Sequence, residues 1–117
     1  MNKITQIKKN IISDLELSEE EADIFLALIK DEKTSSTSFK KNFAQDMKRM
    51  IINCKKLEQK GMIIEINENE YQVLHPRFAI VNRYRRLCGE KNIQFKKNIK
   101  IDSLGIMLEN YQNKEHQ

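Results

Sequence analysis

Residues that break helices or build reactive centres are scarce in this sequence. Its 117 residues include three glycines, one proline, two cysteines, two histidines and no tryptophan. So few glycines and prolines agree with a folded, α-rich chain rather than a disordered one. Cys54 and Cys88 have no CxxC spacing and no nearby histidine, so neither a zinc site nor a redox motif is expected. We expect no metal and no cofactor. Cys54 is expected to be a reduced thiol in the core, and Cys88 to be either reduced or at a contact between subunits.

Recognisable catalytic groups are also missing. The sequence has no glycine-rich phosphate loop, no nucleophile beside a base and no pair of carboxylates in a plausible pocket. His75 precedes Pro76 and is expected to be a turn residue, while His116 lies in the tail. We therefore expect a protein that is not an enzyme.

Long apolar runs are absent as well. No run reaches the roughly 18 apolar residues that a membrane helix needs, and the start MNKITQIKKN lacks the apolar core and cleavage site of a secretion signal. A cytoplasmic protein that does not span a membrane is expected. A chain of this length is expected to form one domain with one or two additional helices.

Charge is distributed in blocks along the chain, although the net charge is only +4. Residues 13–32 contain eight acidic residues and one basic residue, Lys30. Residues 33–60 contain eight basic residues against two acidic ones, and residues 77–100 contain eight against one. This segregation suits a protein with one face for an anionic partner.

Apolar residues at helical spacing predict the helices of the first half. Residues 2–13 carry isoleucines on one stripe, and Ser18 and Glu21 form a capping box at the start of LSEEEADIFLALIK. A short helix with Phe39 and Phe43 is expected within the polar segment that follows.

The third predicted helix covers residues 47–60, and the pattern changes after it. Asp46 can cap this helix, and Gly61 suits the left-handed position just beyond its end. The segment MIIEINENEYQVLHP then predicts a β-hairpin with a polar loop. Pro76 is expected in the first turn of a further helix, with a break at GEKN before a last helix around residues 101–111.

The order of these elements is that of a winged helix-turn-helix domain. The segments LELSEEEADIFLALIKD, KKLEQKGMI and YQVLHPRFAI resemble the DNA-binding domain of the archaeal TrmB-like transcriptional regulators. The resemblance covers about Leu15 to Arg86, with Ala44 where the family usually has a glycine. It implies that residues 47–60 are the recognition helix and residues 67–70 the wing. Because the chain stops before the effector domain of larger members, no small-molecule effector is expected.

We therefore predict a mainly α fold with a small β-hairpin, namely a winged helix-turn-helix with extra terminal helices. Residues 14–88 would form the winged helix-turn-helix domain. Residues 1–13 and residues 89–117, the latter ending in a frayed tail, would each supply a helix for dimerisation.

The third helix carries the principal candidate DNA contacts. Arg49 and Asn53 lie one turn apart and offer donors that read guanine and adenine edges, while lysines neutralise phosphates. Ile52 on the same side is expected to pack in the core, with a thymine methyl contact as the alternative. The full predicted set is Lys48, Arg49, Asn53, Lys55, Lys56, Arg77 and Arg83.

These basic residues also fit roles that do not involve DNA. Lysines on a helix surface commonly form no more than a solvated face. The arginines of residues 77–86 are equally able to pair with the acidic first helix of this or another subunit. The predicted wing is acidic at Glu65, Glu68 and Glu70, which repels phosphate.

Apolar stripes on both terminal helices predict a twofold dimer, which would place two recognition helices about one DNA turn apart. The predicted interface consists of Ile4, Ile7, Ile11, Ile101, Leu104, Leu108 and Tyr111. The competing arrangement packs both stripes within one subunit. The predicted function is a homodimeric transcriptional regulator that binds double-stranded DNA. The alternative is a winged-helix protein–protein interaction module that does not bind DNA.

Overall fold

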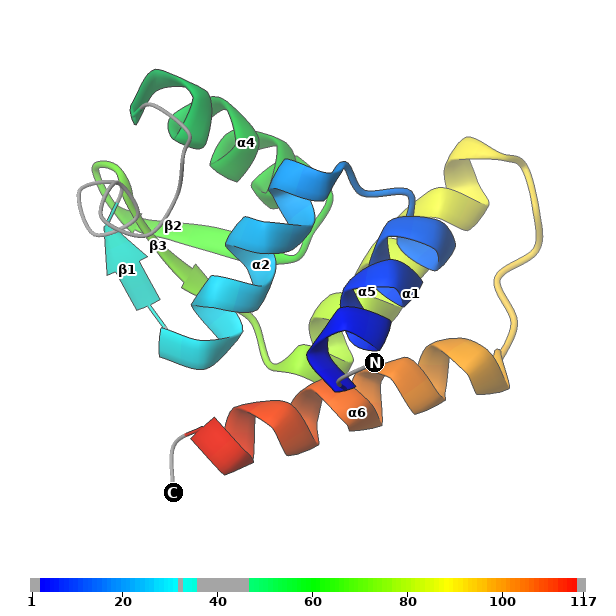
Figure 1. Ribbon diagram of the computed structural model, residues 1–117. Coiled ribbons are helices and arrows are strands. Elements are labelled where there is room, and N and C mark those ends of the chain that lie inside the picture. The colour runs from blue at the N-terminus through cyan, green and yellow to red at the C-terminus, as the bar shows by residue number, and fades with distance from the viewer. Residues whose placement is uncertain (1–2, 32, 36–46, 116–117) are drawn as a thin grey trace.

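The computed structural model describes residues 3–31, 33–35 and 47–115. Within these ranges the chain is mainly helical with a small antiparallel sheet, which confirms the predicted class at this level (Figure 1). The predicted short helix with Phe39 and Phe43, and the cap at Asp46, fall outside the described residues. The elements in chain order are α1 (Lys3–Leu15), α2 (Glu19–Asp31), β1 (Lys33–Ser35), α4 (Met47–Gln59), β2 (Ile63–Asn67), β3 (Glu70–Val73), α5 (Pro76–Glu90) and α6 (Ile99–Glu115).

The sheet has three strands in the order β1-β3-β2, and both pairings are antiparallel. The predicted hairpin is present as β2 and β3, with Ile63 opposite Val73 and a register shift between Glu65 and Asn67. Asn69 in its turn has a φ of 59°, a conformation that asparagine adopts more readily than most residues. Strand β1 was not predicted. It pairs with β3 and makes that strand the centre of the sheet.

Helix α2 begins at the predicted capping box. The Glu21 amide donates to the Ser18 hydroxyl at 3.0 Å, and the Ser18 amide donates to the Glu21 carboxylate at 2.8 Å. These two bonds satisfy amide groups that the first turn of a helix leaves without partners. The same glutamate is only 3% exposed, and it also takes part in the contact between α2 and α4.

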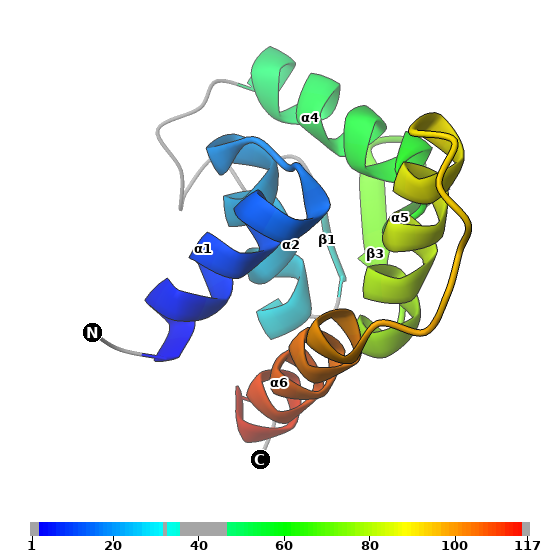
Figure 2. The same ribbon diagram turned by 90° about the vertical axis from the view of Figure 1, so that its right-hand side faces the viewer.

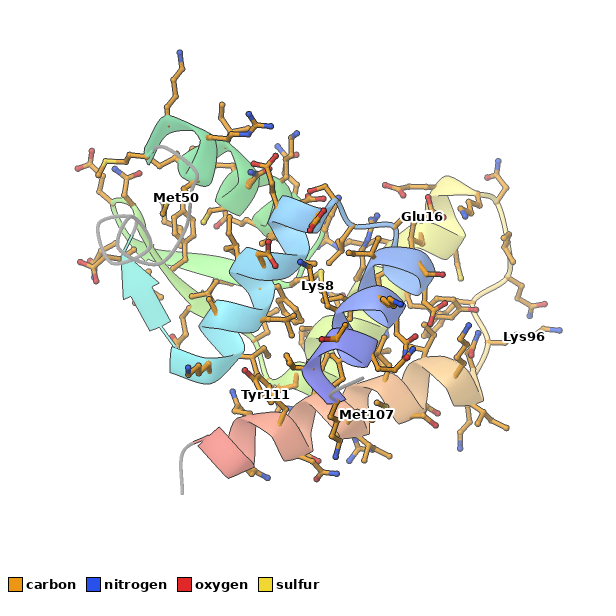
Figure 3. The ribbon with its side chains drawn as sticks, viewed as in Figure 1. Lys8, Glu16, Met50, Lys96, Met107 and Tyr111 are labelled. Carbon is orange, nitrogen blue, oxygen red and sulfur yellow. The ribbon has the colours of Figure 1, made fainter. Side chains whose placement is uncertain are left out.

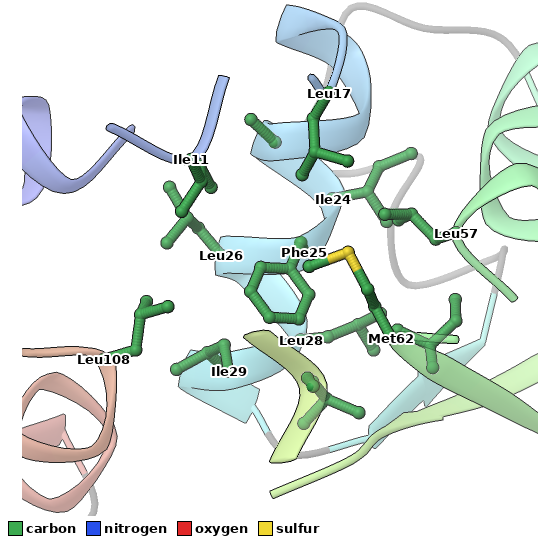
Figure 4. Packing of buried hydrophobic residues seen from close by; sticks show 14 of the residues in the cluster. Ile11, Leu17, Ile24, Phe25, Leu26, Leu28, Ile29, Leu57, Met62 and Leu108 are labelled. Carbon is green, nitrogen blue, oxygen red and sulfur yellow. The ribbon is translucent and has the colours of Figure 1, made fainter. Parts of the chain in front are cut away.

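The core forms around α2, which contacts α1, α4, α6 and the sheet. In Figure 4, Phe25 and its neighbours on α2 lie between Leu108 of α6 and Leu57 of α4. All three of these side chains are fully buried. Because one cluster includes residues from every described helix and from β2 and β3, the terminal helices belong to the same core as the central elements.

The apolar stripes of α1 and α6 are part of this core, which corrects the predicted dimer interface. Ile7, Ile11 and Leu108 are 0% exposed, and Ile101 and Leu104 are at most 3% exposed. Ile4 and Tyr111 are half-buried against the same cluster, and Figure 3 shows Tyr111 directed from α6 toward the rest of the molecule. A side chain that its own chain already covers offers no surface to a partner. The stripes therefore pack within one chain, as in the competing arrangement.

Helix α5 runs between α4 and α6, which lie on opposite sides of the molecule (Figure 2). Pro76 occupies the first turn as predicted, and the His75 side chain accepts a hydrogen bond from the Arg77 amide at 3.3 Å. The helix ends at Glu90, inside the predicted break. Asn82 in the middle of α5 and Arg86 nearer its end contact the C-terminal end of α4, while the first turn of α5 lies against Gly105 of α6.

Candidate nucleic-acid interface

Helix α4 is fixed to the rest of the molecule along one stripe. Met50, Cys54 and Leu57 are fully buried, and the helix contacts α2 and β2. Their spacing of four and three residues places them on one side of a helix. Burial raises the pKa of the Cys54 thiol to about 12. This cysteine is therefore a reduced core residue, as predicted, and it has little thiolate with which to react.

The opposite side of α4 is exposed and cationic. Lys48, Arg49, Lys55 and Lys56 are all exposed, and α4 has no acidic residue before Glu58. Figure 3 shows side chains of α4 that project away from the other elements. Ile52 is 46% exposed among these cations, so the prediction that it packs in the core is wrong. The exposed side thus combines four positive charges with the apolar side chain of Ile52.

The C-terminal end of α4 is held by its own turn and by α5. Gly61 has a φ of 82°, and the amides of Gly61 and Met62 donate to the carbonyls of Glu58 and Leu57 at 3.0 and 3.1 Å. This is the Schellman pattern that ends many helices, and it confirms the predicted role of the glycine. Helix α5 adds two donors, because Asn82 donates to the Gly61 carbonyl at 2.8 Å and Arg86 donates to the Gln59 carbonyl.

Glu20 of α2 occupies the edge of the cationic side of α4. Its two carboxylate oxygens accept hydrogen bonds from Nε and Nη2 of Arg49, each at 2.6 Å. One of the same oxygens accepts from the Asn53 amide at 3.3 Å. The hydrogen bond from Arg49 is the main reason that the pKa of Glu20 lies below its ordinary value. Glu20 is therefore ionised at neutral pH and neutralises the arginine that it holds.

Glu21 joins the other end of α4 to α2. Both of its carboxylate oxygens accept hydrogen bonds from Nζ of Lys60 at 2.8 Å. Burial alone would raise the pKa of Glu21, but the hydrogen bonds from Lys60 and Ser18 outweigh it, and the pKa lies below its ordinary value. Glu20 and Glu21 are adjacent on α2, yet they bind Arg49 near the start of α4 and Lys60 just after its end, about three helical turns apart. Neither contact was predicted from the sequence. One sign of these contacts was nevertheless present there. The first turn of α2 contains three glutamates, and its capping box uses only one of them.

Asn53 does not belong to the exposed face, which corrects its prediction as a base contact. Its side chain lies in the contact between α4 and α2, and the residue is 6% exposed. The reason is its position three residues after Met50 and four before Leu57, which places it at the edge of the buried stripe. Asn53 borders the groove between the two helices, but it presents little surface there and its amide already donates to Glu20.

Arg83 and Arg77 also leave the predicted DNA-binding set. Arg83 is 4% exposed, and its Nε donates to the Leu15 carbonyl at the C-terminal end of α1, at 2.9 Å. A cation at that position stabilises a helix terminus. Arg77 is exposed, but it lies against Gly105 on α6, on the opposite side of the molecule from α4. The predicted contacts that the structure brings together are Lys48, Arg49, Lys55 and Lys56.

Two further features border the cationic side. An open groove of about 440 Å³ lies between the start of α2 and α4, and its lining includes Glu20, Ile52 and Lys56. The β2–β3 hairpin follows α4 in the chain and exposes Glu65, Glu68 and Glu70. Because these carboxylates repel phosphate, the hairpin supplies no attraction for a polyanion.

Within the part of the chain that the structure describes, no group of three or more histidine, cysteine or acidic side chains could hold a metal ion. None of the described helices is both long enough and apolar enough to cross a membrane. The resemblance to TrmB-like regulators stays a prediction. In comparisons with protein-family models, curated proteins and solved structures, nothing matches this chain.

Proposed function

We propose that this protein is a transcriptional regulator that binds double-stranded DNA through the exposed side of α4. The observation that carries the proposal is the division of this helix into two sides. Its apolar stripe is buried on α2 and β2, while Lys48, Arg49, Lys55 and Lys56 all lie on the exposed side. A helix held in this way can enter a groove of DNA without losing its own packing.

The chemistry of the four cations fits a nucleic acid. The major groove of B-DNA admits an α-helix, and lysines along the helix release counterions from the phosphates on either side. The planar guanidinium of Arg49 matches the two acceptors on the guanine edge. We assign phosphate contacts to Lys48, Lys55 and Lys56, and a base contact to Arg49.

The arrangement around α4 supports a winged helix-turn-helix. Helix α2 lies against α4, and the β2–β3 hairpin follows directly, which is the order of elements in that fold. The acidic hairpin is not assigned a DNA contact. The proposal therefore differs from the prediction made from the sequence, since Asn53, Arg77 and Arg83 play no part in it.

The test is the salt dependence of duplex binding, measured by fluorescence anisotropy with a labelled random-sequence duplex. Log affinity for DNA falls as log salt rises, and replacing one lysine that contacts a phosphate makes this slope shallower by about 1. We expect this reduction for Lys48→Ala, Lys55→Ala and Lys56→Ala. Lys9→Ala is the matched control, because Lys9 is an exposed lysine on α1.

Two results would contradict the proposal. The first is the absence of duplex binding by the wild-type chain at low salt, which would favour the interaction module instead. The second is an equal reduction of the slope by Lys9→Ala and by the three replacements on α4, because binding would then follow net charge alone.

A further inference from the structure

The carboxylate of Glu20 is an unexpected group on a surface that is proposed to bind DNA. It accepts two hydrogen bonds from Arg49 at 2.6 Å, and it lines the groove that Lys48 and Lys56 also border. Its side chain is 33% exposed and that of Arg49 is 65% exposed, so an approaching ligand can reach both groups. A DNA phosphate at this groove would meet a negative charge and an arginine that already has an anionic partner.

We propose that Glu20 determines the sequence selectivity of the α4 surface by competing with DNA for Arg49. This inference rests on the proposed function. A carboxylate binds the guanidinium fork in the same bidentate manner as a phosphate or a guanine edge. An isolated phosphate contact gives Arg49 little advantage over Glu20, since one anion replaces another. The guanine edge offers two acceptors in fixed geometry without adding a negative charge near Glu20.

Selectivity then arises because Glu20 weakens the binding of all sequences, while guanine in reach of Arg49 recovers part of the loss. Such discrimination, in which a repulsive group acts against the wrong partner, is a general route to specificity. Replacement of Glu20 by glutamine keeps the shape of the side chain and removes its charge. Arg49 is then able to bind any nearby phosphate, so affinity rises and selectivity falls.

The experiment compares Glu20→Gln with Glu19→Gln on two duplexes of equal length, one of A·T pairs only and one rich in G·C pairs. Glu19 is the preceding residue of α2, and it pairs with Lys8 of α1 at 3.2 Å rather than with α4. Both replacements change the net charge equally. We expect Glu20→Gln to tighten binding to the A·T duplex roughly tenfold, which corresponds to about 1.4 kcal/mol. Binding to the G·C duplex should tighten much less. Glu19→Gln should change both affinities only slightly.

A double-mutant cycle shows whether Arg49 mediates the effect. In the Arg49→Ala background, Glu20→Gln should change the ratio of the two affinities less than about twofold. Circular dichroism of each variant verifies that it is folded.

The outcomes separate the two proposals. If the wild-type chain binds neither duplex at low salt, the proposed function fails. If the wild-type chain binds but Glu20→Gln and Glu19→Gln shift both duplexes equally, the role of Glu20 is overturned and the proposed function stands. Persistence of the Glu20→Gln effect without Arg49 would also overturn it.

Discussion

At Gly61, both the backbone conformation and the neighbouring side chains leave little room for another residue. Its φ of 82° lies in the region that favours glycine, and a Cβ atom there would lie 2.3 Å from Nδ2 of Asn82 and 2.7 Å from Nε of Arg86. Both of those side chains hold the end of α4. An added methyl group would therefore strain the turn and displace the two donors.

We predict that Gly61→Ala lowers the free energy of unfolding by about 1 to 3 kcal/mol, measured by urea denaturation. Gly89→Ala is the control, because Gly89 lies within α5 and a Cβ atom there has no neighbour within 4 Å. The control should stabilise the chain by about 0.5 to 1 kcal/mol, since alanine loses less conformational freedom than glycine in a helix. Equal effects of the two substitutions would contradict this account of the turn.

Single residues also show what the sequence could and could not predict. The turn at Gly61 and the capping box of Ser18 and Glu21 are local, so spacing along the chain predicted them. The contact of Glu21 with Lys60 joins distant segments and was not predicted. Asn53 and Arg83 were assigned to a DNA surface because of their chemistry, but their positions on α4 and α5 face α2 and the end of α1. Arg83 lies three residues after Ile80 and four before Leu87, both buried, so its spacing already indicated the inner side of α5.

The contact between α2 and α4 includes a charge that depends on pH. Glu21 has a pKa below its ordinary value of 4.5, with Lys60 as its cationic partner. A carboxyl whose pKa is lowered by folding stabilises the fold above its unfolded-state pKa, and it loses this contribution as the pH falls through the folded-state value. The contact should therefore be fully stabilising at neutral pH and weaken in acid below about pH 4.5.

We predict that Glu21→Gln reduces the free energy of unfolding at pH 7, and that its difference from the wild type shrinks as the pH falls from about 5 to about 3. Glutamine still completes the capping box, so the comparison isolates the pair with Lys60. The measurement is urea denaturation at a series of pH values. A difference that stays constant over this range would show that the charge of Glu21 does not contribute.

The amphipathic helices and the β2–β3 hairpin were predicted from the sequence, whereas the short polar strand β1 was not. The amphipathic helices and the hairpin have spacings that determine their type. Strand β1 has three residues, Lys33–Ser35, without an apolar alternation, and it exists because β3 offers an edge for pairing. Pairing of this kind depends on the folded sheet and has no signature in three residues.

At the scale of the whole molecule, the sequence predicted the apolar stripes of the terminal helices but did not determine what covers them. The stripes of α1 and α6 have the same spacing whether they cover each other, a core or a second subunit. The structure places them in one core with α2 (Figure 4). Their substitution should therefore affect folding rather than association.

We predict that Leu108→Ala lowers the free energy of unfolding by about 2 to 5 kcal/mol, because it leaves a cavity at a fully buried position. Urea denaturation measures this loss. Sedimentation velocity on the folded variant should give the same association state as the wild type. Unchanged stability with an altered association state would instead support the interface that the sequence suggested.

The two hydrogen bonds from α5 to the end of α4 link the cationic helix to the far side of the molecule. Asn82 and Arg86 bind the carbonyls of Gly61 and Gln59, while the first turn of the same helix lies on α6. Helix α5 thus helps to set the orientation in which α4 meets a ligand, because it contacts both α4 and α6. A chain cut before Pro76 would keep its lysines and lose the support that orients them.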